Sequence, residues 1–404
     1  MSKRRWLVLA FVFLGILVSY IDRGNLSVAN ESIARDLHFP PSTMGLLLSA
    51  FFWSYAAFQI PAGALVDRFG VRGAYAMAFV TWSLASASIA LSRGSADIFA
   101  SRLVLGLAET VGPVASLAAI RASFSERENG LPTAIYIGGQ ALGPSLSLLL
   151  GSMLLVHFGW RAMFAVTGLV ALIWVPGWLK VAPVVEKQVS KTSGFAWRPL
   201  LTSPTLWAMA AFILFSSYYW YFVLTWVPAY LTTSRGFSTL GMGRILSAAL
   251  ACMAVGNVGT GFLSDYFLRR AESLFQVRVW FVAVGSLGAS SLILLNVLPG
   301  NVMGMAVLFV SVCSFGVVSS NFWTLAQNVA PAVKVARVIG FLNTASQLAG
   351  IAAPWITGNI IGPAKHFPPA IAIAGICPLV SLIPLFIASR GMATLRNSLQ
   401  ETMN

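Results

Sequence analysis

Charged side chains are scarce in this sequence. Only 9% of its 404 residues are Asp, Glu, Lys or Arg, whereas 57% are hydrophobic, and the mean hydropathy is +0.80. Soluble globular domains contain about 25% charged residues, because a surface in water needs them. The composition therefore excludes an ordinary soluble domain and predicts a protein whose main solvent is the lipid bilayer.

Acidic residues are the scarcer of the two signs, with 12 Asp and Glu against 26 Lys and Arg, for a net charge of +14. A basic excess can indicate nucleic-acid binding. Here the bases stand singly or in short clusters between apolar runs. That placement is typical of the cytoplasmic loops of membrane proteins, so we expect no nucleic-acid partner.

Cysteine and histidine are also rare, with three residues of each kind. The cysteines (Cys252, Cys313 and Cys377) lie in apolar segments, and the histidines (His38, His157 and His366) are far apart. Neither set has the spacing of a disulfide framework or a metal site. The sequence also lacks a P-loop lysine and a Gly-x-Ser-x-Gly elbow. We therefore expect no metal, no bound cofactor, no catalytic residue and no use of ATP.

Long apolar segments fill most of the chain. About 20 residues of helix span the hydrocarbon core. Segments of this length lie near 5–30, 43–66, 72–92, 96–119, 131–156, 160–180, 205–232, 239–264, 277–297, 301–329, 337–361 and 368–389. They predict an all-α membrane protein with twelve transmembrane helices, the first of which is retained rather than cleaved as a signal peptide. We expect an N-terminal six-helix bundle at 1–180, a cytoplasmic linker at 181–204 and a C-terminal six-helix bundle at 205–404.

The distribution of basic residues predicts the orientation. With both termini inside, 18 of the 26 Lys and Arg fall in inside segments and 6 in outside loops, while Arg23 and Arg102 lie within helices. Cytoplasmic loops of membrane proteins carry such an excess of bases. We therefore predict that both termini are cytoplasmic, as in a multi-pass protein of the bacterial inner membrane.

A repeated motif supports two related halves. Gly63-Ala-Leu-Val-Asp67-Arg68 ends the second predicted helix, and Gly261-Phe-Leu-Ser-Asp265 ends the eighth, with 198 positions between the two aspartates. Six-helix halves related in this way are typical of transporters that rock around a central site. We expect Gly63, Asp67, Arg68, Arg72 and Asp265 to gate the conformational change at the cytoplasmic side.

Four charged residues lie well inside predicted helices: Asp22, Arg23, Arg102 and Glu109. Each costs about 2.5–3.5 kcal/mol at the centre of a membrane helix, so such residues face a cavity or one another. Arg102 and Glu109 are two turns apart on one face, which Gly106 is expected to keep open, and Tyr20 shares a face with Arg23. The alternative is a buried charge network that only holds helix one against helix four.

Uncharged polar residues interrupt other apolar helices. They include Tyr55 and Gln140 in the first half and Ser320, Trp323, Asn343 and Gln347 in the second. One by one they could be hydrogen bonds between helices, and Trp323 could be an apolar filler. Together they predict a polar lining suited to a hydroxylated anion, whose carboxylate an arginine would bind.

These motifs resemble known transporters. Gly63-x-Leu-x-Asp67-Arg68-x-Gly70-x-Arg72 resembles the signature loop of the major facilitator superfamily, and Arg102-x-x-x-Gly106 resembles its fourth-helix motif. Tyr20-Ile-Asp22-Arg23-x-Asn25, the segment 50–61, the segment 102–109, Gly159-Trp160-Arg161 and the segment 340–354 resemble the anion:cation symporter family, which includes bacterial galactonate and hexuronate importers.

The resemblance implies the fold of that superfamily, with two pseudo-symmetric six-helix bundles, and a role for each matching residue. Asp22 and Glu109 would be the protonation sites, Arg102 the coupling partner of Glu109, and Arg23 the carboxylate anchor. The implied sugar-acid contacts are Tyr20, Tyr55, Gln140, Ser320, Trp323 and Asn343.

Two departures keep alternatives open. Pro113 follows Glu109 by four residues rather than the five usual in the family, and Gly139-x-x-x-Gly143-Pro144 resembles a motif of drug exporters. The sequence thus favours a monomeric, proton-driven importer of a small organic anion such as an aldonate or hexuronate. An exporter or exchanger is the alternative within transport, and a membrane-embedded enzyme or sensor is the alternative outside it.

Overall fold

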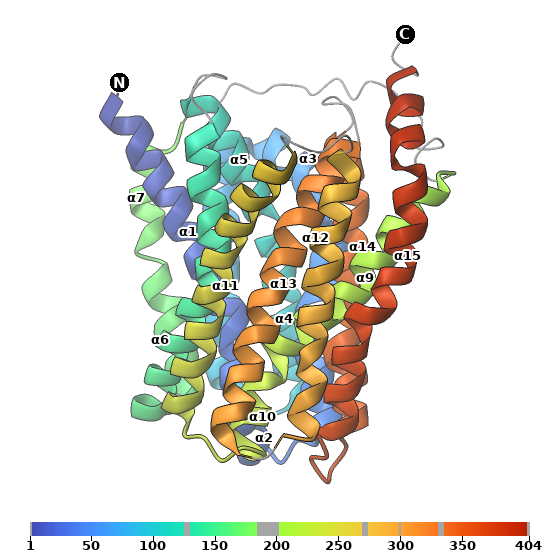
Figure 1. The fold of residues 1–404 in the computed structure, drawn as a ribbon. Helices are drawn as coiled ribbons and strands as arrows, with labels where there is room; N and C mark the ends of the chain where they lie inside the picture. The colour runs from blue at the N-terminus through green and yellow to red at the C-terminus, as the bar shows by residue number, and fades with distance from the viewer. Residues whose placement is uncertain are drawn as a thin grey trace. The chain divides into compact units, whose positions relative to one another are not determined.

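The computed structural model describes residues 2–124, 130–183, 202–268, 274–298, 300–329 and 335–401. Most of the predicted linker lies outside these residues. The described part contains helices and no β-strand, which confirms the predicted all-α class (Figure 1). The helices are α1 (Ser2–Val28), α2 (Asn30–Asp36), α3 (Pro41–Ser88), η1 (Ile89–Leu91), α4 (Ser95–Glu109), α5 (Val111–Ser123), α6 (Gly130–Ala171), α7 (Trp174–Val181), α9 (Pro204–Thr225), α10 (Val227–Thr233), α11 (Thr239–Leu268), α12 (Leu274–Ala289), η2 (Ser290–Asn296), α13 (Asn301–Val329), α14 (Val335–Ile361) and α15 (Pro368–Glu401).

Nine helices of the described residues are long and apolar enough to cross a bilayer. One of these, from Gly138 to Val181, has 44 residues, about twice what one crossing needs, and therefore holds two of the predicted segments. The first part of α3 and the 27 residues of α14 correspond to the predicted segments 43–66 and 337–361. The twelve predicted segments are thus helical along most of their length.

Two glycines break the longest helices where the sequence predicts turns. Gly70 in α3 has φ 73° and ψ 156°, and Gly159 in α6 has φ 76° and ψ 169°. Only glycine adopts this backbone conformation without strain. Each glycine belongs to a motif of the sequence, so these motifs encode the turns between successive membrane segments.

A weaker point in the helical hydrogen bonding lies beside a buried charge. Helices α4 and α5 follow each other through Thr110, which keeps helical dihedral angles (φ −61°, ψ −27°), and together they form one 29-residue membrane span from Ser95 to Ser123. Pro113 lies four residues after Glu109 and has no N–H to donate to the Glu109 carbonyl. Glu109 therefore lies within this span, beside a missing backbone hydrogen bond.

The chain divides into two compact units. The first comprises 1–191, 224–248 and 354–363, and the second comprises 192–223, 249–353 and 364–404. The first unit thus includes segments beyond the predicted N-terminal bundle. A division into compact units does not test whether two six-helix bundles are related by symmetry. The bundles at 1–180 and 205–404 therefore stay a prediction.

The core of the first unit contains an aromatic stack. Phe79 and Trp174 are parallel with ring centroids 4.1 Å apart, and Trp174 and Trp178 stack at 5.1 Å. The indole of Trp174 donates to the Phe11 carbonyl at 2.8 Å, and that of Trp178 to the Arg72 carbonyl at 3.2 Å. The stack thereby holds α1, α3 and α7 against one another.

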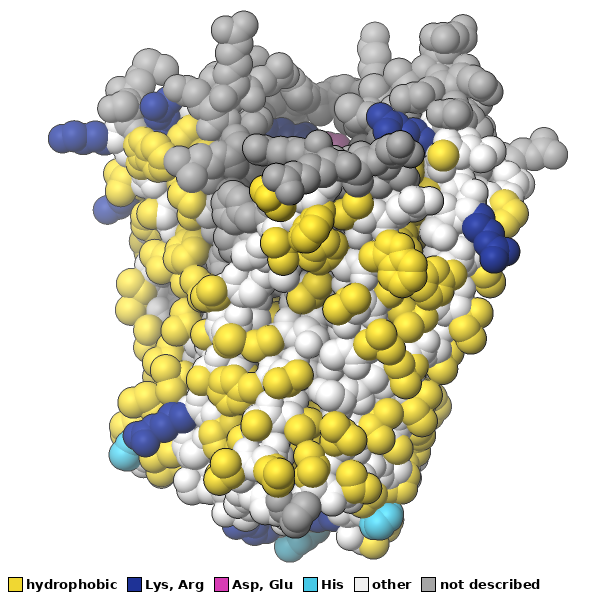
Figure 2. Space-filling view, in the orientation of Figure 1, with side chains coloured by type: hydrophobic (Ala, Val, Ile, Leu, Met, Phe, Trp, Pro, Cys, Tyr) yellow, Lys and Arg dark blue, Asp and Glu magenta, His cyan; other side chains and the backbone are white. Residues whose placement is uncertain are grey.

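The surface follows the rule for a membrane protein. Hydrophobic side chains cover much of the face in Figure 2, and the Lys and Arg side chains lie toward the helix ends. Exposed apolar residues such as Leu84, Val170, Trp280 and Ile383 belong to membrane-crossing helices. In a bilayer these side chains contact lipid rather than water.

Candidate functional site

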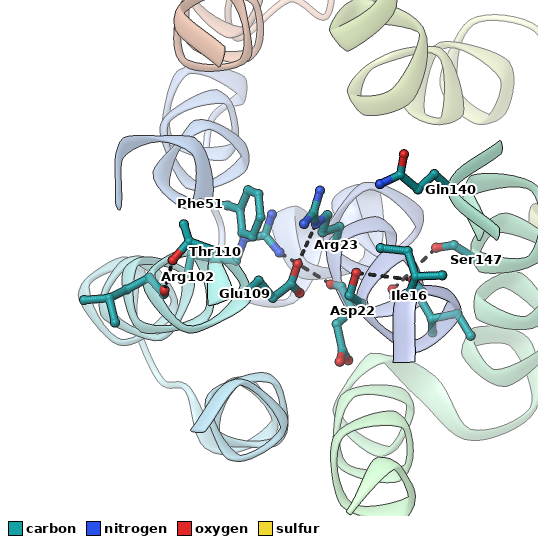
Figure 3. A network of polar contacts seen from close by, with 12 residues as sticks. Ile16, Asp22, Arg23, Phe51, Arg102, Glu109, Thr110, Gln140 and Ser147 are labelled. Carbon is teal, nitrogen blue, oxygen red and sulfur yellow. Dashed lines mark hydrogen bonds and ion pairs between the residues drawn. The ribbon is translucent and has the colours of Figure 1, made fainter. Parts of the chain in front are cut away.

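A buried ion pair inside the first unit joins α1 to α4. Arg23 Nε donates to Glu109 Oε2 at 2.5 Å, and the side chain of Glu109 is 0% exposed while that of Arg23 is 19% exposed. Figure 3 shows the two side chains pointing toward each other. Residues 86 positions apart thus form one ion pair in which the carboxylate is fully buried.

Aromatic rings surround the Arg23 guanidinium. Its Cζ lies 5.1 Å from the ring centroid of Tyr20 and 4.8 Å from those of Phe51 and Tyr55. The predicted shared face of Tyr20 and Arg23 is therefore confirmed. Aromatic rings attract a cation and replace part of its lost hydration.

Phe51 also contacts the second buried arginine, because Arg102 Cζ lies 5.3 Å from the same ring. Phe51 itself is 0% exposed. One apolar ring therefore contacts both cations.

Asp22 turns away from Arg23 and contacts α3. Its Oδ1 accepts a 2.7 Å hydrogen bond from Ser86 Oγ, and both residues are 0% exposed. Arg102 meets Asp22 only at the backbone, where Nη1 donates to the Asp22 carbonyl at 3.5 Å. The prediction that Asp22 and Arg23 are not a simple pair is confirmed.

The resemblance implies that Arg102 is the coupling partner of Glu109. Among the described residues the ion-pair partner of Glu109 is Arg23. Arg102 lies two turns before Glu109 on α4, about 10 Å along the helix axis. The implied role of Arg102 in coupling stays a prediction.

Several buried polar atoms have no hydrogen-bond partner in the described part of the chain. They include Asp22 Oδ2, Glu109 Oε1 and Arg102 Nε. An unsatisfied buried polar atom costs about 1–3 kcal/mol, and more when it is charged. Such a cluster is typical of a site whose proton or ligand content changes during function.

Glycines bring the helices of this site close together. A Cβ at Gly106 would collide with the Phe51 carbonyl and Ser54 Oγ of α3. A Cβ at Gly143 would lie 2.6 Å from Tyr20 Cβ, and one at Gly139 would lie 2.7 Å from Ile16. The prediction that Gly106 keeps this face of α4 open is wrong, because α3 packs against Gly106. The glycine pair of α6 packs against α1.

The remaining predicted substrate contacts of the first unit are Tyr55 and Gln140. Tyr55 is 6% exposed and stacks on Phe51 with centroids 5.2 Å apart. Gln140 Nε2 donates to the hydroxyl of Tyr136, also on α6, at 3.5 Å. Figure 3 shows Gln140 apart from the ion pair. Tyr20, Arg23 and Tyr55 are thus brought together, whereas Gln140 approaches from another helix.

The predicted contacts of the second unit belong to α13 and α14. Ser320 and Thr260 of α11 are joined by a 3.2 Å hydroxyl hydrogen bond. Trp323 is half-buried and packs at 5.6 Å against Phe322. Asn343 Oδ1 accepts from Gln347 Nε2 at 3.4 Å. Each is thus tied to a neighbour within its own unit, and their roles as substrate contacts stay predictions.

The predicted gating loop is exposed. Asp67, Arg68 and Arg72 are exposed, and Arg68 Cζ lies 5.4 Å from the Phe69 ring. Among the described residues no hydrogen bond or ion pair joins Asp67 to a neighbouring helix, and the side chain of Asp265 lies outside them. The gating role of this loop, which includes Gly63, stays a prediction.

A second ion pair involves Asp36, which lies outside the membrane-crossing segments. Arg161 Nη1 and Trp160 Nε1 both donate to Asp36 Oδ2, at 2.5 and 3.1 Å. These contacts hold the pKa of the Asp36 carboxyl below its ordinary value, with the Arg161 hydrogen bond as the largest cause. The Gly159-Trp160-Arg161 motif thereby ties the α6 turn to the end of α2.

Sequence reasoning did not single out the partners that orient these groups. Ser86, Phe51 and Tyr221 contact candidate residues, yet serines and aromatic residues are too common in this chain to be conspicuous.

Among the described residues no group of three or more His, Cys, Asp or Glu could hold a metal ion.

Comparisons with known proteins agree with this architecture. The chain is 28% identical to a probable galactarate/D-glucarate transporter of Escherichia coli K12 over 94% of its length and 93% of the relative. It is 28% identical to a hexuronate transporter of Bacillus subtilis, covering 93% of this chain and 92% of the relative.

A solved structure has the same fold. It is a bacterial homologue of the human lysosomal transporter Spinster, in an inward-facing and unoccupied conformation, with a TM-score of 0.84 and 18% identity over 98% of this chain and 99% of the other. The family and these relatives are transporters, which excludes the membrane-embedded enzyme. The sequence pattern of the Major Facilitator Superfamily matches residues 12–354, and the chain belongs to that family of multi-pass membrane transporters, as its motifs predict.

Proposed function

We propose that this protein imports a small organic anion, a sugar acid such as an aldonate or hexuronate, together with protons. Relatives that carry sugar acids at 28% identity over nearly the whole chain support the substrate class. The observation that carries the proposal is the Arg23–Glu109 ion pair, because the guanidinium suited to bind a substrate carboxylate already holds a carboxylate of the protein.

The ion pair supplies a physical reason for coupling. A substrate carboxylate and Glu109 compete for one guanidinium, since both are planar acceptors of its N–H groups. When the substrate wins, Glu109 is left without its cation at a position that is 0% exposed. An unpaired buried carboxylate is costly, and a proton removes the cost. Substrate and proton therefore favour each other's binding, and this coupling is reciprocal.

Charge balance leads to the same result. With all four groups ionised, Arg23 and Arg102 balance Asp22 and Glu109, so the site is neutral. A monocarboxylate adds one negative charge, and one proton restores neutrality. We propose that Glu109 takes this proton. Asp22, held by Ser86, is a second protonation site, and Arg102 stabilises α1 through the Asp22 carbonyl.

The hydroxyl groups of the substrate need polar partners. In this proposal Tyr20, Tyr55 and Gln140 of the first unit supply such partners, and Ser320, Trp323 and Asn343 keep the same role that the resemblance implies for them. Amides and hydroxyls both donate and accept, so they suit a polyhydroxylated chain. The proton is the only coupling ion we propose, and no bound cofactor is part of the cycle.

The proposal includes a location: a monomer in the bacterial inner membrane with both termini in the cytoplasm. Phosphatase and fluorescent-protein fusions after Asn404 test the orientation. An inactive phosphatase and a bright fluorescent protein are expected, and the reverse pattern would contradict the topology.

Uptake by proteoliposomes tests the function. A panel of labelled aldonates, uronates, aldarates and simple monocarboxylates is offered under an inward proton gradient, an inward sodium gradient or no gradient. We expect the proton gradient alone to drive accumulation of at least one hydroxylated acid. Accumulation driven only by the sodium gradient would replace the proposal with sodium symport. Outward transport of the acid, with no accumulation under any of these gradients, would replace it with an exporter.

A further inference from the structure

The carboxyl group of Asp22 has one hydrogen-bond partner in the described part of the chain. Ser86 Oγ of α3 lies 2.7 Å from Asp22 Oδ1, and both residues are 0% exposed. The other oxygen, Oδ2, has no hydrogen-bond partner among the described residues. One serine hydroxyl therefore replaces all the water that this carboxyl group would have outside the protein.

The charged groups around Asp22 belong to α1 and α4. Arg102 donates to the backbone carbonyl of Asp22 at 3.5 Å, and Arg23, the next residue of α1, pairs with Glu109. The positive charge of Arg102 favours the charged form of Asp22, and the negative charge of Glu109 opposes it. The charged and histidine side chains of α3, α5, α6 and α7 are exposed and do not face Asp22: Asp67, Arg68, Arg72, Arg121, His157, Arg161 and Lys180.

The hydroxyl contact stabilises the charged form of Asp22 more than the neutral form. A charged carboxylate only accepts hydrogen bonds, so Ser86 then donates. A protonated carboxyl group can donate or accept in the same contact, but a hydrogen bond to a charged group is roughly twice as strong as one between neutral groups. Loss of the hydroxyl therefore favours the protonated form, whichever way the neutral pair is arranged.

We propose that Ser86 is a positioning residue that holds the Asp22 carboxylate and thereby sets the pH at which Asp22 takes up a proton during transport. Ser86 acts through Asp22 rather than on the substrate. This inference rests on the proposed function, because it takes Asp22 as the second protonation site of a proton-driven importer.

The expected effect is a shift in pH dependence. We expect Ser86→Ala to move the midpoint of the Asp22 titration to higher pH by about one unit, which is a tenfold gain in proton affinity. The alkaline limb of the pH profile of uptake should move in the same direction, because Asp22 then keeps its proton at a higher external pH.

Ser83→Ala is the matched control. Ser83 lies one turn before Ser86 on α3 and is also 0% exposed, but its hydroxyl has no hydrogen-bond partner among the described residues. The control thus removes a buried hydroxyl from the same helix and keeps the bond to Asp22. Ser86→Cys, which offers a weaker donor of similar size, is a second test variant and should shift the titration in the same direction as Ser86→Ala.

Infrared spectroscopy follows the protonation of Asp22 without any substrate. The full chain is reconstituted in liposomes, and the carbonyl stretching band of protonated carboxyl groups is titrated with pH. The part of the band that is absent from Asp22→Asn belongs to Asp22. Uptake of labelled galactonate, gluconate, galacturonate and glucuronate is then measured on the same preparations over a range of external pH at a fixed proton gradient.

The outcomes distinguish this proposal from the proposed function. A shift of both the Asp22 band and the alkaline limb to higher pH in the Ser86 variants, with Ser83→Ala like the wild type, supports the role of Ser86. An unmoved band, an unmoved limb or an equal shift in Ser83→Ala overturns it, while proton-driven uptake by the wild type leaves the proposed function standing. If the wild type accumulates none of these acids, the proposed function fails and Ser86 loses its role in transport, whatever the infrared titration shows.

Discussion

At the scale of single residues, Arg23 is the group on which most contacts of the site converge. It pairs with Glu109, and three aromatic rings lie within 5.1 Å of its guanidinium. Planarity matters to both kinds of contact, since a flat guanidinium stacks on rings and offers parallel N–H groups to a carboxylate. The charge alone does not reproduce this.

Arg23→Lys therefore tests geometry at constant charge. We expect substrate affinity to weaken by about 2 kcal/mol, roughly thirtyfold, because lysine lacks the planar fork. Binding is measured by calorimetry, with Arg235→Lys as the control, since Arg235 bonds Tyr230 in a different part of the unit. Unchanged affinity in Arg23→Lys would remove Arg23 from the binding site.

Asp36 allows a test of pH dependence at the residue scale. Its pKa is held below the ordinary aspartate value of about 3.9 by Arg161 and Trp160. Since the folded pKa is lower than the unfolded one, the stabilisation is present above about pH 4 and disappears as the pH falls through the folded pKa. Asp36→Asn removes the titrating group and with it this part of the acid response.

We expect the melting temperature of the wild type to fall more between pH 6 and pH 3 than that of Asp36→Asn. Differential scanning fluorimetry of the detergent-solubilised protein measures this. Asp67→Asn, which removes another exposed carboxylate, serves as the control. Parallel curves for wild type and Asp36→Asn would show that the Asp36–Arg161 contact does not stabilise the fold.

At the scale of helices, most of what the structure contains follows from the sequence. Apolar length predicts the membrane segments, and Gly70 and Gly159 mark breaks that need positive φ. The ion pair between Arg23 and Glu109 did not follow. It depends on how α1 and α4 are rotated against each other, and spacing within one helix carries no information about that rotation.

The close approach of the two helices α3 and α4 can be tested directly. A methyl group at Gly106 would collide with the Phe51 carbonyl, whereas one at Gly73 would meet nothing within 4 Å. We expect Gly106→Ala to destabilise the protein by about 1–3 kcal/mol. Gly73→Ala, the control, should be neutral or slightly stabilising. Equal melting temperatures for the two variants would show that α3 and α4 adjust without cost.

At the scale of the whole molecule, transport needs the binding energy of substrate and proton to act on one equilibrium. The fold and family are those of a transporter. In the proposed cycle the substrate carboxylate competes with Glu109 for the guanidinium of Arg23, and Glu109 converts this competition into proton coupling. Glu109→Gln keeps the shape of the side chain and removes its charge, as protonation would.

Three assays on one preparation of Glu109→Gln, compared with the wild type, test that claim most directly: calorimetric binding, counterflow exchange and accumulation driven by an inward proton gradient. The account predicts that the variant binds substrate at least as tightly, because the competing carboxylate has lost its charge, and still exchanges it. Accumulation should fall to the level seen without a gradient. Undiminished gradient-driven accumulation in Glu109→Gln would contradict the account and assign coupling to Asp22 or to another ion.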